Sequence, residues 1–507
     1  MSGGNGKNPA PGAGIHLWIP LELKIYYGGE EMSSSSQASQ RINSLLDENS
    51  FVEIGALVKA RNTDFNLKQT ETPSDGVVTG YGLISGRLVY VYAQDASVLG
   101  GSVGEMHAKK IANLYDLALK MGAPVIGLIN SAGLRLQEAT DALNAFGEIY
   151  RKQVDASGVI PQVTAVLGSC GGGLALFTGM TDFTFMEEKN GKLFVNSPNA
   201  IEGNSIEKCD TSSAKWQQSE VGTVDVVADE ATIYAQIREL ISLLPSNNED
   251  SDSYDECTDD LNRVCEGLEN CAADPALLFA QIADNGAFFE TKRGYAKDMV
   301  TGFVRLAGAT VGVFGNRSAL YDENGEAKEK FDASLSAHAC EKAASFVNFC
   351  DAFDIPVLSF TNVEGFAASK CDERHVTRNA SRLVAALANA TVPKVNVITE
   401  KAFGSAYVVM NSKAVGADMT FSWPGAKIGT MNADHAAKII ADGKDSAEVA
   451  KTAEEYAKLQ NNSESAAARG YVDTIINAAD TRKYVIGAFE MLYSKRDERP
   501  AKKHTTV

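Results

Sequence analysis

The stretch IPQVTAVLGSCGGGLAL, residues 160–176, decides the fold because the chain contains it twice. Its counterpart is VPKVNVITEKAFGSAYVV, residues 392–409, where an apolar run again leads through a glycine-containing turn into a second apolar run. A further pair, GAPVIGLINSAG (122–133) and DIPVLSFTNVEG (354–365), precedes them at the same offset of 232 residues. A constant offset over two separate motifs indicates two copies of one fold in tandem.

Each copy alternates short apolar runs with amphipathic stretches. In the first copy, RLVYVYAQD (87–95) is typical of a strand, and EMHAKKIANLYDLALKM (105–121) has apolar residues at helical spacing. This alternation predicts parallel sheets covered by helices, an α/β fold. The acidic polar run SNNEDSDSYDECTDD (246–260) is typical of a linker or surface loop. We therefore expect one domain over residues 32–260 and a second over residues 261–507.

The repeated turns suggest a chemical role for their glycines. A strand that runs directly into a helix leaves the first N–H groups of the helix without partners, and the helix dipole favours negative charge there. Glycines such as Gly172 and Gly404 let a ligand atom approach the backbone without a Cβ in the way. The alternative is that they only permit a tight turn and close packing. Two equivalent anion-stabilising turns would suit a reaction with two carbonyl-like centres.

The composition describes a globular chain of 507 residues with a formal net charge of −18. This charge argues against nucleic acid as the main partner, because phosphate binding needs clustered Lys and Arg. No apolar run is long enough to cross a bilayer, and no P-loop motif for ATP occurs. Residues 1–31 differ in composition from the rest of the chain, so we interpret them as a disordered or non-native leader.

The cysteines and histidines give no sign of a metal site. The eight cysteines contain no CxxC pair, and the six histidines lack metal-ligand spacing. Without a recognisable signal peptide, cysteines scattered through apolar segments suggest reduced thiols and a cytoplasmic location. We expect His107 to cap or pack a helix, and Asp182 and Asp418 to accept structural hydrogen bonds.

With these motifs the chain resembles the carboxyltransferase subunit of biotin-dependent acyl-CoA carboxylases, transcarboxylases and decarboxylases. The resemblance covers roughly Ala38 to the C-terminus. It is carried by QRINSLLDENSFVEIG, SDGVVTGYG, GGSVGEMHAKKI, LALKMGAPVIGL, MTDFTFM, GTVDVVADEATIYAQI, KAASFVNFCDAFDIPVL, ATVPKVNVITEKAFGSAY, SKAVGADMTFSWPGA and KRDERPAKKH. It implies two tandem crotonase-like domains built of ββα repeats, and an oligomer, commonly a hexamer arranged as a trimer of dimers.

The resemblance also implies roles for the two turns. The first domain would hold the enolate oxygen of an acyl-CoA thioester, and the second would hold the ureido oxygen of biotin carried on another chain. Partners implied are a biotin carboxyl carrier protein, and a biotin carboxylase or a membrane decarboxylase subunit. The implied catalytic residues are Gly172, Gly173, Ala132 and Gly133 for the acyl-CoA, and Gly404, Ser405, Ala406, Gly365 and Phe366 for biotin. Arg135, Gly171 and Val408 are the further expected contacts with coenzyme A or biotin.

Several positions depart from the pattern of relatives. Ser405 stands where glycine is usual, the segment 368–383 replaces a glycine-rich one, and Val408 stands where propionyl-using relatives often have Asp. For Arg135, a salt bridge with a local carboxylate is the alternative to a coenzyme A contact. The leading function is transfer of a carboxyl group between biotin and acetyl-, propionyl- or methylmalonyl-CoA. The alternatives are the α subunit of a sodium-pumping methylmalonyl-CoA decarboxylase and a non-catalytic scaffold subunit.

Overall fold

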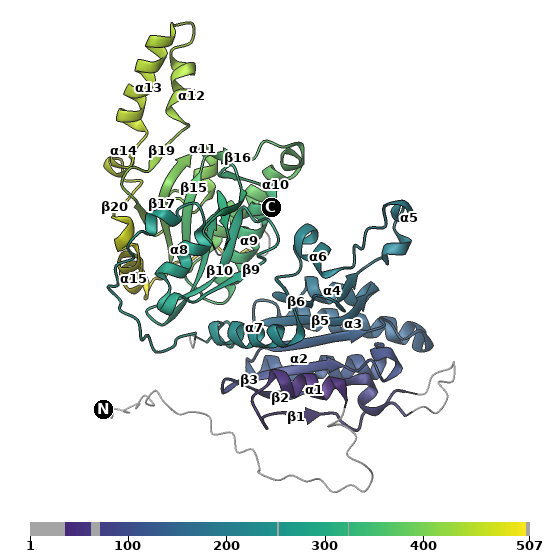
Figure 1. The fold of residues 1–507 in the computed structure, drawn as a ribbon. Coiled ribbons are helices and arrows are strands. Elements are labelled where there is room, and N and C mark those ends of the chain that lie inside the picture. Colours follow the sequence, from purple (N-terminus) through teal and green to yellow (C-terminus); the bar gives the residue numbers. More distant parts are fainter. Residues whose placement is uncertain (1–35, 62–70, 251–252, 323, 503–507) are drawn as a thin grey trace, which may run out of the picture.

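The computed structural model describes residues 36–61, 71–250, 253–322 and 324–502. The leader expected over residues 1–31 lies outside these ranges. Figure 1 shows two helix-covered sheets that follow one another along the chain, with α7 (Glu230–Leu243) at the junction between them.

Two eight-stranded sheets form the centres of the two halves. The first contains β1 (Val52–Ile54), β2 (Val77–Ile84), β3 (Arg87–Gln94), β4 (Val125–Ser131), β5 (Gln162–Gly171), β6 (Phe183–Glu187), β7 (Lys192–Phe194) and β8 (Val226–Ala228). The second contains β9 (Phe288–Thr291), β10 (Met299–Leu306), β11 (Ala309–Asn316), β15 (Val357–Val363), β17 (Lys394–Phe403), β18 (Met419–Ser422), β19 (Lys427–Gly429) and β20 (Thr474–Ile475). Two short pairs are β12 (Ala319–Tyr321) with β13 (Ala327–Lys330), and β14 (Ser334–Leu335) with β16 (Gly365–Phe366).

The two sheets have the same topology and register. In each, an antiparallel pair of strands (β2–β3, β10–β11) leads into parallel strands (β4–β5–β6, β15–β17–β18). Ile126 pairs with Val163 in the first sheet, and Leu358 pairs with Val395 in the second, each residue 232 positions after its counterpart. The predicted α/β class with parallel sheets is confirmed, and the repeat offset is the structural offset.

Helices cover the sheets where the amphipathic stretches predict them. They are α1 (Gln37–Leu45), α2 (Glu105–Met121), α3 (Ala139–Ala156), α4 (Leu176–Gly179), α5 (Asn204–Glu207), α6 (Ala214–Trp216), α7, α8 (Pro275–Ile282), α9 (Ala337–Ala352), α10 (Lys370–Asn389), α11 (Gly404–Val409), α12 (Ala433–Ile440), α13 (Ser446–Gln460), α14 (Ser463–Ala468) and α15 (Thr481–Leu492). In the part of the chain that the structure describes, none of them could span a membrane.

The duplication extends to buried polar groups. The Lys110 ammonium donates to the carbonyl oxygens of Ser74 at 3.1 Å and Val77 at 2.5 Å. Lys342, 232 residues later, donates to the carbonyl oxygens of Tyr295 at 2.9 Å and Met299 at 2.7 Å. Burial lowers the pKa of Lys110 to about 8 and that of Lys342 to about 7. Each lysine holds the segment that enters the first long strand of its sheet.

Asp182 and Asp418 fix the start of the central strand in each half. The backbone N–H of Gln162 donates to Asp182 Oδ2 at 2.8 Å, and Asp182 N–H donates to the Gln162 carbonyl at 2.9 Å. Lys394 and Asp418 make the same reciprocal pair, both at 2.8 Å. The prediction that both aspartates are structural acceptors is confirmed.

The halves share apolar contacts. Phe183 of β6 packs against Phe303 of β10 and Phe349 of α9, with ring centroids 6.0 and 4.9 Å apart. Arg305 donates from Nη2 to the carbonyl of Ser242 at 2.7 Å. The two sheets are therefore held together within one chain by a joint core.

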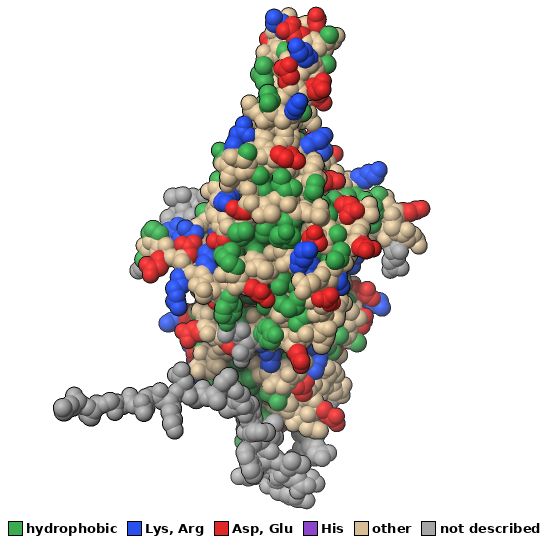
Figure 2. Space-filling model, turned by 90° about the vertical axis from the view of Figure 1, so that its left-hand side faces the viewer, with side chains coloured by type: hydrophobic (Ala, Val, Ile, Leu, Met, Phe, Trp, Pro, Cys, Tyr) green, Lys and Arg blue, Asp and Glu red, His purple; other side chains and the backbone are tan. Residues whose placement is uncertain are grey.

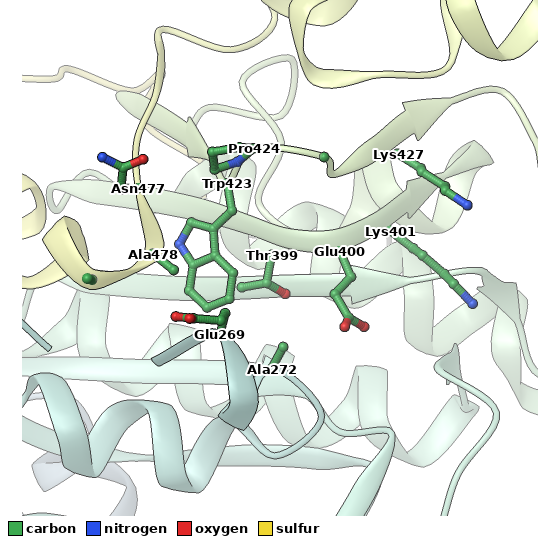
Figure 3. Close-up of a pocket in the computed structure, with 12 residues that line it drawn as sticks. Glu269, Ala272, Thr399, Glu400, Lys401, Trp423, Pro424, Lys427, Asn477 and Ala478 are labelled. Atoms are coloured by element: carbon green, nitrogen blue, oxygen red, sulfur yellow. The ribbon is translucent and has the colours of Figure 1, made fainter. Parts of the chain in front are cut away.

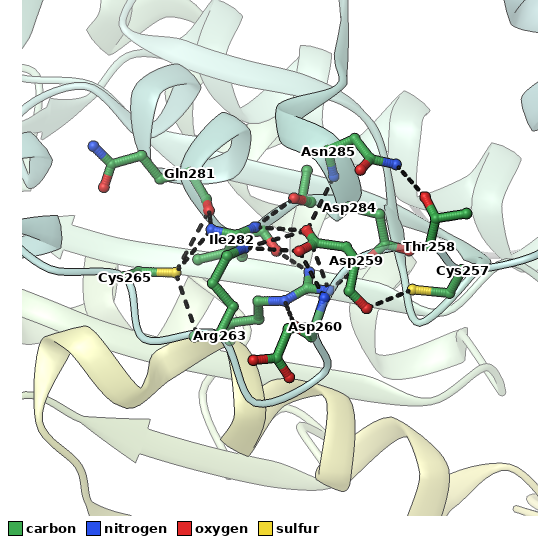
Figure 4. Close-up of polar contacts among 12 residues, drawn as sticks. Cys257, Thr258, Asp259, Asp260, Arg263, Cys265, Gln281, Ile282, Asp284 and Asn285 are labelled. Carbon is green, nitrogen blue, oxygen red and sulfur yellow. Dashed lines mark hydrogen bonds and ion pairs between the residues drawn. The ribbon is translucent and has the colours of Figure 1, made fainter.

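The acidic run 246–260 leads into a segment that is fastened to α15 (Figure 4). The fully buried Arg482 guanidinium donates to the Ile282 carbonyl at 2.5 Å and to Asp284 Oδ1 at 2.6 Å, and lies 3.6 Å from Asp259 Oδ2. Where it is described, the run is irregular, as predicted, but its end is pinned by buried charge rather than free.

Helices α12 and α13 form an arm that projects from the second half (Figure 1). No residue of α13 is buried, and Ile439 of α12 and Leu459 of α13 are 66% and 65% exposed. Figure 2 shows charged side chains of both signs near the end of this arm.

Candidate functional site: two duplicated turns

The first turn lies where β5 runs through a 3₁₀ turn (Gly172–Ala175) into the short helix α4. Gly172 has φ +64°, and a Cβ built on it would meet no atom within 4 Å, so its Cα faces open space. A Cβ on Gly171 would lie 2.7 Å from the Phe194 ring, which leaves Gly171 no room for a side chain. The Gly173 carbonyl accepts a 2.6 Å hydrogen bond from the Tyr150 hydroxyl. Gly172 is therefore the open position, and its neighbours fix the turn.

The companion loop after β4 lies beside this turn, because a Cβ on Gly133 would be 3.5 Å from the Gly171 carbonyl oxygen. The Ala132 N–H donates to the Gly100 carbonyl at 2.8 Å, and the Gly133 N–H donates to Ser131 Oγ at 3.0 Å. The expectation that Ala132 supplies a donor for an oxyanion is therefore not supported, since its N–H is already bonded within the backbone.

Leu134 supplies the donor that sequence reasoning missed. Its neighbours are paired with Val103, which donates to the Gly133 carbonyl at 2.8 Å and accepts from the Arg135 N–H at 3.0 Å. Among the described residues the Leu134 N–H has no acceptor. The alternation of bonded and unbonded groups along a parallel bridge is the physical reason, and it cannot be read from a run of small residues.

The second turn repeats the first at the end of β17. Gly404 has φ +60°, and a Cβ built on it would lie 3.2 Å from the Thr430 carbonyl oxygen. Ser405 is exposed, Ala406 is buried, and Val408 is 39% exposed. The turn therefore keeps the backbone shape of the first one, while Ser405 adds a hydroxyl at its rim.

The second companion loop also matches the first. The Glu364 N–H donates to the Ala333 carbonyl at 2.8 Å, as Ala132 does to Gly100, and the Ala367 N–H donates to the Leu335 carbonyl at 2.9 Å. A Cβ on Gly365 would meet no atom within 4 Å, and Phe366 occupies the position equivalent to Leu134. The structure thus brings Gly365 and Phe366 next to the turn of α11.

Arg135 is an internal residue and does not face a ligand. Its side chain is fully buried, and Nη1 lies 2.6 Å from Asp75 Oδ1 and 2.9 Å from Glu138 Oε1. Nη2 donates to the Ser102 carbonyl at 2.7 Å. The expected contact between Arg135 and coenzyme A is therefore not supported; the alternative, a salt bridge with local carboxylates, describes what the structure contains.

A buried network continues from Asp75 to the end of β4. Asp75 Oδ2 accepts the His107 N–H at 2.8 Å, and His107 Nδ1 lies 3.0 Å from the Asp75 carbonyl oxygen. His107 Nε2 lies 3.3 Å from Gln94 Nε2, and Gln94 Oε1 accepts the Asn130 N–H at 3.3 Å. Burial lowers the pKa of His107 to about 3, so the ring is neutral at pH 7. The prediction of a packing role for His107 is confirmed.

Burial acts in the opposite direction on Asp75. It raises the pKa of this carboxyl group, while the Arg135 guanidinium counteracts part of the increase. Asp75, Arg135 and Glu138 together place two carboxyl groups on one guanidinium in a buried environment. Removing one partner from such a cluster is costly, so the loop from Ser131 to Arg135 has little freedom to move.

Cavities open beside both turns. One of about 430 Å³ lies beside α4 and includes Leu176 and Phe194 in its lining. One of about 420 Å³ lies beside α11 and includes Gly404, Ser405 and Val408. Tyr456 and Arg469 also line the second cavity, and no local sequence motif indicates them, because they come from α13 and from the end of α14.

A larger cavity of about 650 Å³ lies elsewhere along β17, with the Trp423 ring in its wall (Figure 3). Its charged groups are partly engaged, since Glu400 accepts from Asn362 at 2.7 Å and Lys401 pairs with Glu364 at 3.0 Å. None of the residues predicted for the site lines this cavity. The functional candidates remain the two turns.

Comparison with known proteins agrees with the duplicated site. Residues 32–507 match the carboxyl transferase domain family. The chain is 38% identical to a methylmalonyl-CoA decarboxylase subunit alpha of Veillonella parvula, over 97% of this chain and 98% of the relative. It is 39% identical to a propionyl-CoA carboxylase beta chain of Roseobacter denitrificans, over 93% of each.

A solved structure of transcarboxylase 12S, described as a hexamer assembly with hydrolysed methylmalonyl-coenzyme A bound, superimposes with a TM-score of 0.86. It is 36% identical and covers 92% of each chain. This similarity confirms the predicted crotonase-like fold. With two matching sheets, two matching turns and a family match from residue 32 to residue 507, the chain belongs to the carboxyl transferase domain family of carboxyltransferase subunits.

Proposed function

We propose that this subunit transfers a carboxyl group between biotin on a carrier protein and a short-chain acyl-CoA, with acetyl-, propionyl- and methylmalonyl-CoA as candidates. The observation that carries the proposal is the pairing of two open glycine turns, at Gly172 and Gly404, in a chain of the carboxyl transferase family. The names of the relatives support acyl-CoA thioesters of three and four acyl carbons.

We assign residues 32–260 to the acyl-CoA and residues 261–507 to biotin. In the first half, the Leu134 N–H and the turn from Gly172 to Gly173 offer backbone dipoles to the thioester oxygen as negative charge develops on it. Dipoles that are fixed before the reaction stabilise such charge without reorganisation. The buried Arg135 cluster keeps Leu134 in place, so the chain needs no side-chain nucleophile.

The second half fits the ureido oxygen of biotin. The Cα of Gly365 is open, and the space at Gly404 would be filled by a Cβ 3.2 Å from the Thr430 carbonyl oxygen. A flat ring can approach backbone where side chains are absent. When bound, biotin donates or accepts the carboxyl group. Gly404, Ser405 and Ala406 hold its oxygen in our proposal, with Gly365 and Phe366 on the other side.

We also propose a hexamer. Apolar side chains are exposed around both turns, among them Ile206 (85%) and Leu176 (47%) in the first half and Leu459 (65%) in the second. Exposed apolar groups of this kind mark protein contacts. The similar transcarboxylase 12S structure is described as a hexamer assembly. A biotin carboxyl carrier protein is the expected further partner, and we propose a cytoplasmic location.

The methylmalonyl-CoA decarboxylase relative supports a second candidate, in which the same transfer runs toward biotin for a membrane subunit. One assay tests both candidates: release of CO2 from malonyl-CoA and methylmalonyl-CoA by the purified chain, with and without free biotin. Biotin-dependent release supports carboxyl transfer and identifies the acyl group. Absence of release from both thioesters, with and without an added biotin carrier, favours the non-catalytic scaffold.

A further inference from the structure

The duplication places two cavities at equivalent positions, and they differ in charge. Leu176 in the lining of the first corresponds to Val408 in the second, 232 residues later, and Phe194 corresponds to Gly429 through the pairing of β7 and β19. Among the described residues, no Asp, Glu, Lys or Arg lines the first cavity. The described lining of the second contains one cation, Arg469, and no acid.

Arg469 is anchored through one end of its guanidinium. Its Nη1 donates to the Ser465 carbonyl at 2.9 Å and to the Ser465 hydroxyl. No carboxylate among the described residues pairs with this guanidinium, although the chain has 65 acidic side chains against 47 basic ones. A guanidinium that keeps N–H groups available in a cavity is suited to bind a carboxylate, often with two parallel hydrogen bonds.

The other walls define what can accompany that carboxylate. Val408, Ile428 and Ala466 are apolar, and Tyr456 and Tyr471 add aromatic surface. The glycine and serine of the second turn belong to the same cavity. A ligand that fits would therefore combine a small apolar body with a carboxylate, and would lie next to the turn that we assign to biotin.

We propose that this cavity binds the carboxylate that is transferred, with Arg469 as its counter-ion. The proposal rests on the proposed function. The carboxylate belongs to the malonyl-type thioester in one direction of transfer and to carboxylated biotin in the other. The equivalent cavity of the first half, whose described lining has no charged side chain, lacks the means to select a carboxylate.

Binding to the full-length chain tests the proposal. Methylmalonyl-CoA carries a carboxylate and propionyl-CoA does not, so their affinities are compared by calorimetry for wild type, Arg469→Gln and Arg469→Lys. Loss of a charge-assisted hydrogen bond is expected to weaken methylmalonyl-CoA binding by about tenfold to a hundredfold in Arg469→Gln. Propionyl-CoA binding should change by less than about twofold, and Arg469→Lys should lie between, because lysine keeps the charge without the planar fork.

A second arm follows transfer from N-carboxybiotin to propionyl-CoA, which tests the carboxylate on the biotin side. The exposed Arg151, which pairs with Asp155 on its own helix, serves as matched control through Arg151→Gln. A loss in either arm that is specific to the Arg469 variants supports the proposal.

Unchanged behaviour of Arg469→Gln in both arms would overturn the inference while leaving the proposed function intact. Equal weakening of both thioesters would also overturn it, because the effect would not depend on the carboxylate. Failure of the wild type to bind either thioester would overturn the proposed function as well, so the two failures are distinguishable.

Discussion

Gly172 and Gly404 are equivalent residues: each ends the central strand of its sheet with a left-handed backbone, at φ +64° and +60°, and the two are 232 positions apart. The strands that precede them share one register, and the loops that accompany them share one pattern of backbone hydrogen bonds. A single turn design thus occurs twice, with room for ligand atoms at each glycine.

Replacing Gly172 by valine should abolish turnover. The variant places a branched Cβ in the open space above the turn, and the left-handed backbone disfavours β-branched residues. We expect the rate of CO2 release to fall by at least about a hundredfold, the cost of removing an oxyanion donor in other enzymes. Size-exclusion chromatography should show an unchanged oligomer.

Gly325→Val is the matched control for backbone strain. Gly325 has φ +80°, and a Cβ there would meet nothing within 4 Å, but it lies in the β12–β13 pair, away from both turns. Activity in Gly325→Val together with inactivity in Gly172→Val supports the role of the turn. An active Gly172→Val enzyme would contradict it.

Leu134→Pro should lower kcat about a hundredfold while Leu134→Ala stays active. Proline removes the N–H, and this N–H makes no hydrogen bond within the described chain. Circular dichroism and kinetics of both variants check the prediction. Equal activity of the two variants would show that the Leu134 N–H takes no part in the reaction.

Arg135→Met should destabilise the first half by about 3–5 kcal/mol, because it leaves Asp75 and Glu138 as unpaired buried carboxyl groups. Denaturant unfolding followed by circular dichroism measures the change. Arg61→Met removes an exposed pair with Glu105 and should change stability little. If both variants unfold at the same denaturant concentration as the wild type, the buried cluster does not hold the loop.

His107 should make stability depend on pH between about 3 and 6.5. Its pKa is lowered to about 3 in the fold, whereas the unfolded chain binds the proton below its ordinary value of 6.5. Stability is therefore lost as the pH falls from 6.5 toward 3, by roughly 3 kcal/mol at pH 4. His107→Asn, which keeps a donor toward Asp75, should remove this component from unfolding curves measured at pH 4 to 7. Parallel curves for both proteins would rule it out.

Much of the fold was predictable because duplication leaves its record at a constant offset. The offset placed Gly172 and Gly404 at equivalent turns, and it also holds for Lys110 and Lys342, whose role as buried clamps depends on contacts with another segment. Asp182 was predictable as an acceptor because of its position relative to the strand.

The rest depends on contacts that sequence spacing does not encode. Whether the Ala132 or the Leu134 N–H stays free is decided by the pairing with the segment from Gly100 to Val103. Arg135 becomes internal because Asp75, 60 residues earlier, lies against it. Arg469 reaches the second cavity through the arm and α14, which no local motif indicates.

The most direct test of the two-turn assignment is steady-state CO2 release from methylmalonyl-CoA by Gly172→Ala and Gly404→Ala, with thioester and free biotin varied independently. We predict that Gly172→Ala impairs saturation by the thioester, whereas Gly404→Ala impairs saturation by biotin and leaves the thioester dependence unchanged. If both variants affect the same substrate, or if Gly404→Ala leaves biotin saturation unchanged, the assignment of one turn to each substrate is wrong.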